Sequence, residues 1–225
     1  MEEEKVWIRQ AVAGDREAFS RLVEAYQIPV YNLAYRMLGD AREAEDAAQE
    51  TFLRAYTRLT TYQTDKKFSS WLLAIASHHC IDRLRRRRFT WLSLDELPFP
   101  DQAAGARNQP EEAAIRQEER EEVRRMLDQL PPQYRAAVIL RYWYELSYRE
   151  IAEVMGTTES AVKSRLYRAR ERLAQQAMAS QTAETAHNAQ KGEGSHLHGG
   201  GGQGQSPLVT ICALDSAAAR RSERR

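Results

Sequence analysis

The sequence predicts an all-α protein with two small helical domains, a flexible acidic linker between them and a disordered C-terminal tail. Two blocks carry apolar residues at helical spacing, and the acidic segment between them contains three of the chain's seven prolines. After residue 176 the composition turns to Ala, Gln, Ser and then Gly, which cannot bury enough surface to fold alone. We expect domains over 1–92 and 118–176, a linker over 93–117 and a tail over 177–225.

The first domain is predicted to begin with a long helical pattern that Asp15 can cap and Gly39 ends. Pro29 lies inside this pattern and predicts a kink or a restart of the helix. Asp40 starts the next helix, and Glu43, three residues later, is placed to close a capping box.

The last helix of the first domain is predicted to be buried, because it is apolar on nearly all sides. It follows a polar turn, begins at Phe68 and emerges into solvent at the run from Arg85 to Arg88. Its apolar residues are Phe68, Trp71, Leu72 and Ile75 on one face and Leu73, Ala76 and Cys80 on another.

The second domain is predicted to contain a helix-turn-helix. An apolar stripe over 123–130 stops at Pro131. Ser147 and Glu150 have the spacing of a capping box and start a short helix, which Gly156 ends.

A final helix, which Thr158 can cap, is expected from residue 159 to about 175. One face is apolar and consists of Val162, Leu166, Ala169 and Leu173. Another face is hydrogen-bonding or cationic and consists of Ser160, Lys163, Ser164, Tyr167 and Arg168. Such a face suits the major groove of DNA, although an ordinary amphipathic helix would show it too. The capped helix that precedes it favours DNA binding.

The charge is distributed unevenly along the chain. The total of 33 basic and 32 acidic residues gives a net charge of +1, which argues against a uniformly basic nucleic-acid coat. Residues 61–92 nevertheless carry +5 and residues 123–176 carry +4, with −6 over 93–122 between them. Basic segments indicate contact with a polyanion, but solvated Arg-rich helix faces would look the same.

Aromatic residues accompany the cations of the first basic segment. Tyr62, Phe68 and Trp71 flank Lys66 and Lys67. This mixture suits unstacked single-stranded bases and their phosphates. The alternative is that Phe68 and Trp71 are core residues, which we favour for Trp71.

The sequence offers little for catalysis, metals or membranes. His78, His79 and Cys80 are adjacent on a helix and cannot close on one ion, and no nucleotide-binding or hydrolase motif is present. We expect no enzyme activity, no catalytic residue, no metal and no cofactor. No apolar run approaches the roughly 18 residues of a membrane span, and the acidic N-terminus is not a signal peptide, so we expect a cytoplasmic protein without membrane insertion.

The chain resembles bacterial extracytoplasmic-function (ECF) sigma factors, small sigma-70-family initiation subunits of RNA polymerase. The resemblance spans about residues 5–92 and 123–175 and is carried in order by several motifs. Those similar to sigma region two are DAAQETF from Asp46 and FSSWLLAIA from Phe68, followed by the Arg run. Those similar to sigma region four are Leu130-Pro131, LSYREIA from Leu146 and AVKSRLYRAR from Ala161.

The resemblance implies a role for each surface. The residues matching the helix that docks on the clamp of the polymerase beta-prime subunit are Asp46, Gln49, Glu50 and Leu53. Those matching the part that captures the minus-ten element are Tyr62, Lys66, Lys67, Phe68, His78, Arg85 and Arg86, with His78 where many members carry Asn. Those matching the reader of the minus-thirty-five element are Arg141, Ser160, Lys163, Ser164, Tyr167 and Arg168. The acidic linker would thread towards the active-site channel.

The implied partners are core RNA polymerase, through its beta-prime clamp and beta flap, promoter DNA and an anti-sigma factor. Two other functions remain open from the residues. A helix-turn-helix regulator that binds duplex DNA without polymerase would explain the second domain but not the acidic helix around Asp46. An adaptor that never touches DNA would leave the cationic residues 160–170 without a role.

Overall fold

The computed structural model describes residues 2–63, 66–93 and 121–191, and every regular element within them is helical. The predicted linker over 93–117 and the end of the tail lie almost entirely outside the described residues. The chain divides into two compact units. Among the described residues, the first unit holds everything through residue 93 and Leu127–Leu166, and the second holds 121–126 and the helix from Tyr167 onward.

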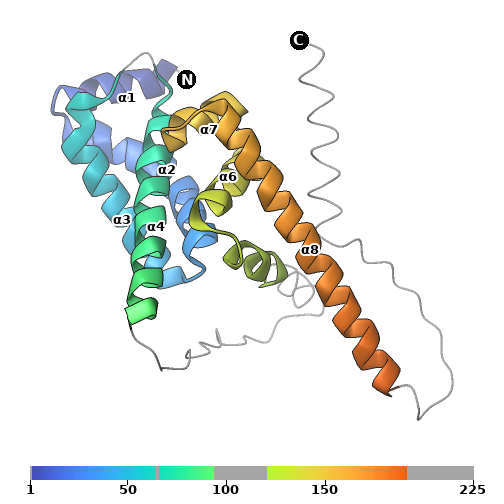
Figure 1. Ribbon diagram of the computed structural model, residues 1–225. Helices are drawn as coiled ribbons and strands as arrows, with labels where there is room; N and C mark the ends of the chain where they lie inside the picture. The colour runs from blue at the N-terminus through green and yellow to red at the C-terminus, as the bar shows by residue number, and fades with distance from the viewer. Residues whose placement is uncertain (1, 64–65, 94–120, 192–225) are drawn as a thin grey trace. The chain divides into compact units, whose positions relative to one another are not determined.

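Three long helices form the core of the first unit, together with a short N-terminal one. They are α1 (Glu2–Val12), α2 (Arg16–Leu38), α3 (Ala41–Arg58) and α4 (Phe68–Ser93), with a 3-10 turn η1 (Leu59–Thr61) after α3. α4, green in Figure 1, packs against both α2 and α3. Its residues Leu72, Ala76 and Cys80 are fully buried, which confirms the prediction of a buried helix.

The predicted signals at the ends of α2 are confirmed. The Asp15 carboxylate accepts hydrogen bonds from the backbone N–H groups of Glu17 and Ala18, at 2.9 and 3.2 Å. Gly39 ends α2 with φ of 76°, a left-handed conformation that glycine adopts without steric cost. The α2–α3 connection is therefore fixed by local chemistry.

Two expectations for this unit are corrected. Pro29 does not restart the helix, because α2 continues through it. Pro29 has no N–H to donate to the carbonyl of Ala25. Ala25 is exposed, so water can donate a hydrogen bond to this carbonyl instead. Asp40 caps α3 by accepting from the Glu43 N–H at 2.8 Å, but the Glu43 carboxylate pairs with arginines of α4, and the capping box does not close.

The helix-turn-helix is present as predicted. Residues 121–128 are helical, and α6 (Pro132–Tyr142), α7 (Tyr148–Met155) and α8 (Glu159–Lys191) follow. α6 and α7 pack against α4 and against each other, in the same unit as α2.

The caps of α7 and α8 also follow the prediction. Ser147 and Glu150 close a complete capping box at the start of α7, and Gly156 ends the helix with φ of 58°. The Thr158 hydroxyl accepts from the Ala161 N–H at 3.2 Å and caps α8. These bonds fix the turn between the two helices.

The last helix is longer than predicted. α8 was expected to end near residue 175 and runs to Lys191. Residues 176–191 contain five alanines and neither Gly nor Pro, so nothing in them stops a helix before Gly192. The helix therefore continues into the first part of the predicted tail over 177–225, and the rest of that tail lies outside the described residues. None of the described helices is long and apolar enough to cross a bilayer.

Candidate nucleic-acid and partner interfaces

The outer face of α3 exposes an apolar side chain among polar ones. Asp46, Gln49 and Leu53 all point to solvent, and the Leu53 side chain is 62% exposed. The opposite face is buried on the core through Ala44, Ala47, Thr51 and Ala55. An exposed leucine on a rigid helix beside carboxylates is suited to docking another protein.

Glu50, the fourth residue predicted on this face, is held by a neighbour. Its carboxylate accepts from Arg54 Nε at 2.6 Å, and this bond lowers the pKa of Glu50. Asp46 lies 3.8 Å from Arg83 of α4. The acidity of this face is therefore partly balanced by arginines of the same fold.

The predicted minus-ten aromatics form a packed cluster. Tyr62 and Phe68 are buried, and their ring centroids lie 5.4 Å apart. Trp71 and Tyr26 complete the cluster, each 5.5 Å from the Phe68 ring. The Tyr62 hydroxyl donates to the carbonyl of Lys66 across the loop. The rings of Tyr62 and Phe68 therefore face the interior of the unit, where they cannot stack on bases.

Lys66 and Lys67 lie exposed at the end of this loop. Further along α4, His78, Arg85 and Arg86 are also exposed, at positions i, i+7 and i+8 that share one helix face. These five predicted minus-ten residues are accessible to a ligand.

His79, the neighbour of His78, points elsewhere. It is half-buried beside Arg54 and Arg83, and its Nε2 atom is buried without a hydrogen-bond partner. Burial first, and then Arg54, lowers the pKa of His79. The two histidines thus occupy different surroundings, as adjacent helical residues must. Within 2–63, 66–93 and 121–191, no group of three or more His, Cys, Asp or Glu could hold a metal ion.

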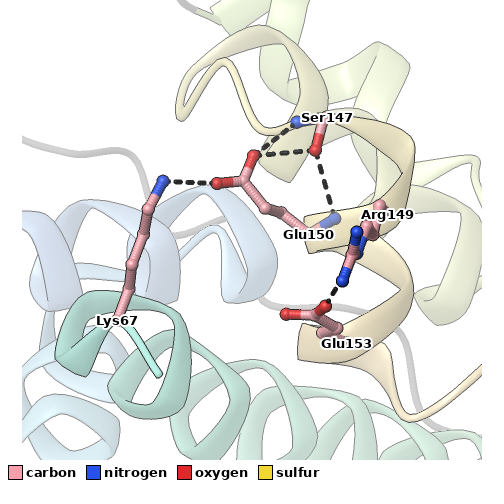
Figure 2. Close-up of polar contacts among 5 residues, drawn as sticks. All are labelled: Lys67, Ser147, Arg149, Glu150 and Glu153. Carbon is pink, nitrogen blue, oxygen red and sulfur yellow. Dashed lines mark hydrogen bonds and ion pairs between the residues drawn. The ribbon is translucent and has the colours of Figure 1, made fainter. Parts of the chain in front are cut away.

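One of the loop lysines reaches the helix-turn-helix. Lys67 Nζ lies 2.6 Å from Glu150 Oε1, as Figure 2 shows, while the other Glu150 oxygen serves the cap at Ser147. The bond from Lys67 is the largest cause that lowers the pKa of Glu150 to about 2. These residues line an open polar pocket of about 540 Å³, together with Lys66, Ser70, Arg149 and Glu153.

Two contacts, one buried and one part-buried, join α2 to the segment containing α6 and α7, and neither was predicted from the sequence. Arg135 of α6 is 5% exposed and donates to the Met37 carbonyl at 2.6 Å and to Asp128 Oδ1 at 2.8 Å. The Tyr144 hydroxyl donates to the Pro29 carbonyl at 2.5 Å. The two acceptors on α2 are the backbone carbonyls of Met37 and Pro29. Every residue has a backbone carbonyl, so no pattern in the sequence marks these two.

The two faces of α8 are arranged as the helical spacing predicts. Val162, Leu166, Ala169 and Leu173 are buried, whereas Ser160, Lys163, Ser164, Tyr167 and Arg168 are exposed. The Tyr167 side chain is 58% exposed although it is aromatic. A stripe of donors on a capped helix after a tight turn is the geometry by which a helix-turn-helix enters the major groove.

Arg141, the remaining predicted reader, lies at the end of α6. Its Nη1 donates to the Leu146 carbonyl at 3.0 Å, and its guanidinium lies 5.2 Å from the centroid of the Tyr148 ring. The Lys163 ammonium lies 5.8 Å from the same ring. Tyr148 stands inside the LSYREIA motif but was not predicted as a contact residue, because Arg141 and Lys163 lie seven and fifteen residues away in sequence and only the fold brings them to its ring.

The chain matches two family models, Sigma-70 region 2 over residues 22–90 and Sigma-70, region 4 over residues 120–173. The fold and these two matches define a sigma-70-type transcription initiation factor. The ECF RNA polymerase sigma factor SigW of Bacillus subtilis is 36% identical over 175 residues, which cover 75% of this chain and 94% of the relative. RNA polymerase sigma-H factor of Pseudomonas aeruginosa is 36% identical over 176 residues, covering 76% of this chain and 91% of the relative.

The chain belongs to the ECF sigma factors of the sigma-70 family. It directs RNA polymerase to promoters and is not an enzyme. Among solved structures, CnrH in complex with the cytosolic domain of CnrY shares the fold with a TM-score of 0.58 and 24% identity, covering 79% of this chain and 98% of that one. RpoE with the anti-sigma factor NepR from Bartonella quintana gives a TM-score of 0.51 and 21% identity, covering 69% and 93%.

Proposed function

We propose that the exposed face of α3 docks this sigma factor on the clamp of the polymerase beta-prime subunit. The observation that carries the proposal is Leu53, whose side chain is 62% exposed on a helix whose other face is fully packed. Asp46 and Gln49 share its face, and Glu50 would contribute through its ion pair with Arg54. An apolar anchor inside a polar rim is the arrangement that carries most of the energy in protein interfaces.

The test is Leu53→Ala in a binding assay with purified core polymerase. We expect the Kd to rise by about tenfold, because removing an interface leucine costs on the order of 1–2 kcal/mol. Met178→Ala is the matched control, since Met178 is 69% exposed on α8, away from α3 in sequence and element. Equal binding by Leu53→Ala and the unchanged chain would refute the docking face.

For the minus-ten element, we propose that Lys66, Lys67, His78, Arg85 and Arg86 contact the opened promoter strand. Their exposure and charge support this, and single strands are bound through such electrostatic tracks. Tyr62 and Phe68 act indirectly, because their buried rings hold the loop that carries the two lysines.

For the minus-thirty-five element, we propose that α8 reads the duplex through its exposed face together with Arg141. The readers are Ser160, Lys163, Ser164, Tyr167 and Arg168. Run-off transcription with core polymerase tests both assignments, on templates altered in one element at a time. Transcription that is unaffected by changes in one element would refute the assignment for that element.

We also propose an anti-sigma factor as a partner and the bacterial cytoplasm as the location. The support is the fold shared with CnrH, which was solved in complex with the cytosolic domain of CnrY, and with RpoE, which was solved with the anti-sigma factor NepR. For the domain limits we retain 1–92 and 118–176, supported by the two family matches, with 93–117 as the linker. Affinity capture of the tagged chain from its own bacterium, before and after stress, tests for the partner.

A further inference from the structure

The ring of Tyr148 lies beside two cations that come from different helices. Arg141, from the end of α6, has its guanidinium carbon 5.2 Å from the ring centroid. Lys163, from the second turn of α8, has its ammonium 5.8 Å from the same centroid. Both distances lie within the roughly 6 Å over which an aromatic face attracts a cation.

The ring itself is held in a fixed place. Tyr148 is the first residue of α7, directly after Ser147, and the Ser147–Glu150 capping box fixes the backbone there. Arg141 is further restrained by its bond to the Leu146 carbonyl, 3.0 Å away in the same turn. Tyr148 is half-buried, so one part of the ring packs while the rest stays accessible.

Two long cationic side chains would otherwise repel each other and sample many rotamers. Each such side chain loses conformational freedom when a complex immobilises it, and this loss opposes binding. A ring that attracts both cations offsets their repulsion and removes part of that cost before DNA arrives. The ring therefore favours the arrangement that binding requires.

We propose that Tyr148 is a positioning residue for promoter recognition, which holds Arg141 and Lys163 together so that both meet the same stretch of duplex DNA. The proposal rests on the proposed minus-thirty-five function of those two cations. The aromatic ring performs this role, and the hydroxyl group is not needed for it.

The variants follow from that distinction. Tyr148→Phe keeps the ring and removes the hydroxyl, whereas Tyr148→Leu keeps an apolar group and removes the ring. The assay uses the full chain with core polymerase and a fluorescent duplex that the unchanged holoenzyme has selected from a random library. We expect the Phe variant to bind within about twofold of the unchanged chain, and the Leu variant to bind roughly five- to tenfold more weakly.

A second comparison separates positioning from general packing. In a chain that carries Arg141→Gln and Lys163→Gln, adding Tyr148→Leu should change the Kd by less than about twofold, because nothing remains to position. If the Leu variant fails to fold, phenylalanines with increasing fluorination at position 148 keep the shape and weaken the ring's attraction for cations. The Kd should then rise with each added fluorine.

Three kinds of result would overturn the proposal. A Phe variant as weak as the Leu variant would assign the role to the hydroxyl. A Kd that does not change with fluorination, or an undiminished effect of Tyr148→Leu in the doubly substituted chain, would reduce Tyr148 to packing. If Arg141→Gln and Lys163→Gln themselves leave the Kd unchanged, the minus-thirty-five assignment fails as well, and this pattern is distinct from the other two.

Discussion

Replacing Arg135 with methionine should destabilise the first unit by about 2 kcal/mol. The guanidinium is 5% exposed and makes three hydrogen bonds, one to the Met37 carbonyl at 2.6 Å and two to Asp128, each at 2.8 Å. Methionine fills a similar volume but donates nothing. The variant therefore removes the bonds while it keeps most of the packing.

The magnitude follows from what each acceptor loses. Met37 lies in the last turn of α2, where a carbonyl has no donor within the helix, so Arg135 supplies one and adds a favourable cation at that helix end. A buried acceptor without a donor costs about 1–3 kcal/mol. The Asp128 carboxylate is 45% exposed and returns to water, so it adds little.

One effect opposes this loss. Burial lowers the pKa of Arg135, and its Nε atom has no hydrogen-bond partner, so the charged group sits in a costly place. Removing it recovers part of that desolvation. We therefore expect the middle of the range and not its upper limit, about 2 kcal/mol, or a fall in Tm of roughly 4–8 °C.

Urea unfolding of the full chain, followed by far-UV circular dichroism, measures the effect. Arg149→Met is the matched control, because the Arg149 side chain is 80% exposed and only faces Glu153 at 3.4 Å, so its loss should cost under about 0.5 kcal/mol. A variant at Arg135 as stable as the unchanged chain would show that desolvation cancels the bonds, and the reasoning would be wrong.

Three further predictions concern single side chains. Arg168→Ala should cost about 1–3 kcal/mol of promoter binding in a way that depends on the minus-thirty-five sequence, and an equal loss on every sequence would indicate phosphate contact alone. His78→Ala should slow promoter opening, seen by permanganate footprinting of unpaired thymines, whereas His79→Ala, on the side facing Arg54, should not. In a chain with Cys212→Ser, Cys80 should resist thiol reagents at pH 8 until the protein unfolds, because burial raises its pKa to about 12 and only the thiolate reacts. Labelling of the native chain as fast as of the unfolded one would contradict that burial.

Most of the features that the sequence predicted correctly are determined by local chemistry. Asp15, Gly39, Gly156 and the Ser147–Glu150 box act within four residues of themselves, so their caps could be read directly. The two faces of α8 follow from helical periodicity for the same reason.

Prediction failed where a partner is distant in sequence. Glu43 had the spacing to close a cap, but Arg87, brought near by the packing of α4 on α3, took its carboxylate instead. Tyr62 and Phe68 have the composition of a base-stacking surface, and only the fold decides that their rings are buried and pack edge to face on each other. Local propensity cannot rank such alternatives, because the competing partners lie in other helices.

The same distant pairing bears on how the first basic segment can act on DNA. Residues 61–92 carry a net charge of +5 in sequence, yet Lys67 is paired with Glu150 and Arg87 with Glu43 within the fold. Affinity for DNA grows with the number of phosphates that the protein's cations neutralise, because each neutralised phosphate releases counterions. A cation that must first leave a carboxylate exchanges one ion pair for another and adds less to that affinity. The free chain should therefore attract DNA less than its segment charge implies. The cations that are held in the weakest ion pairs should contribute most of the affinity for DNA.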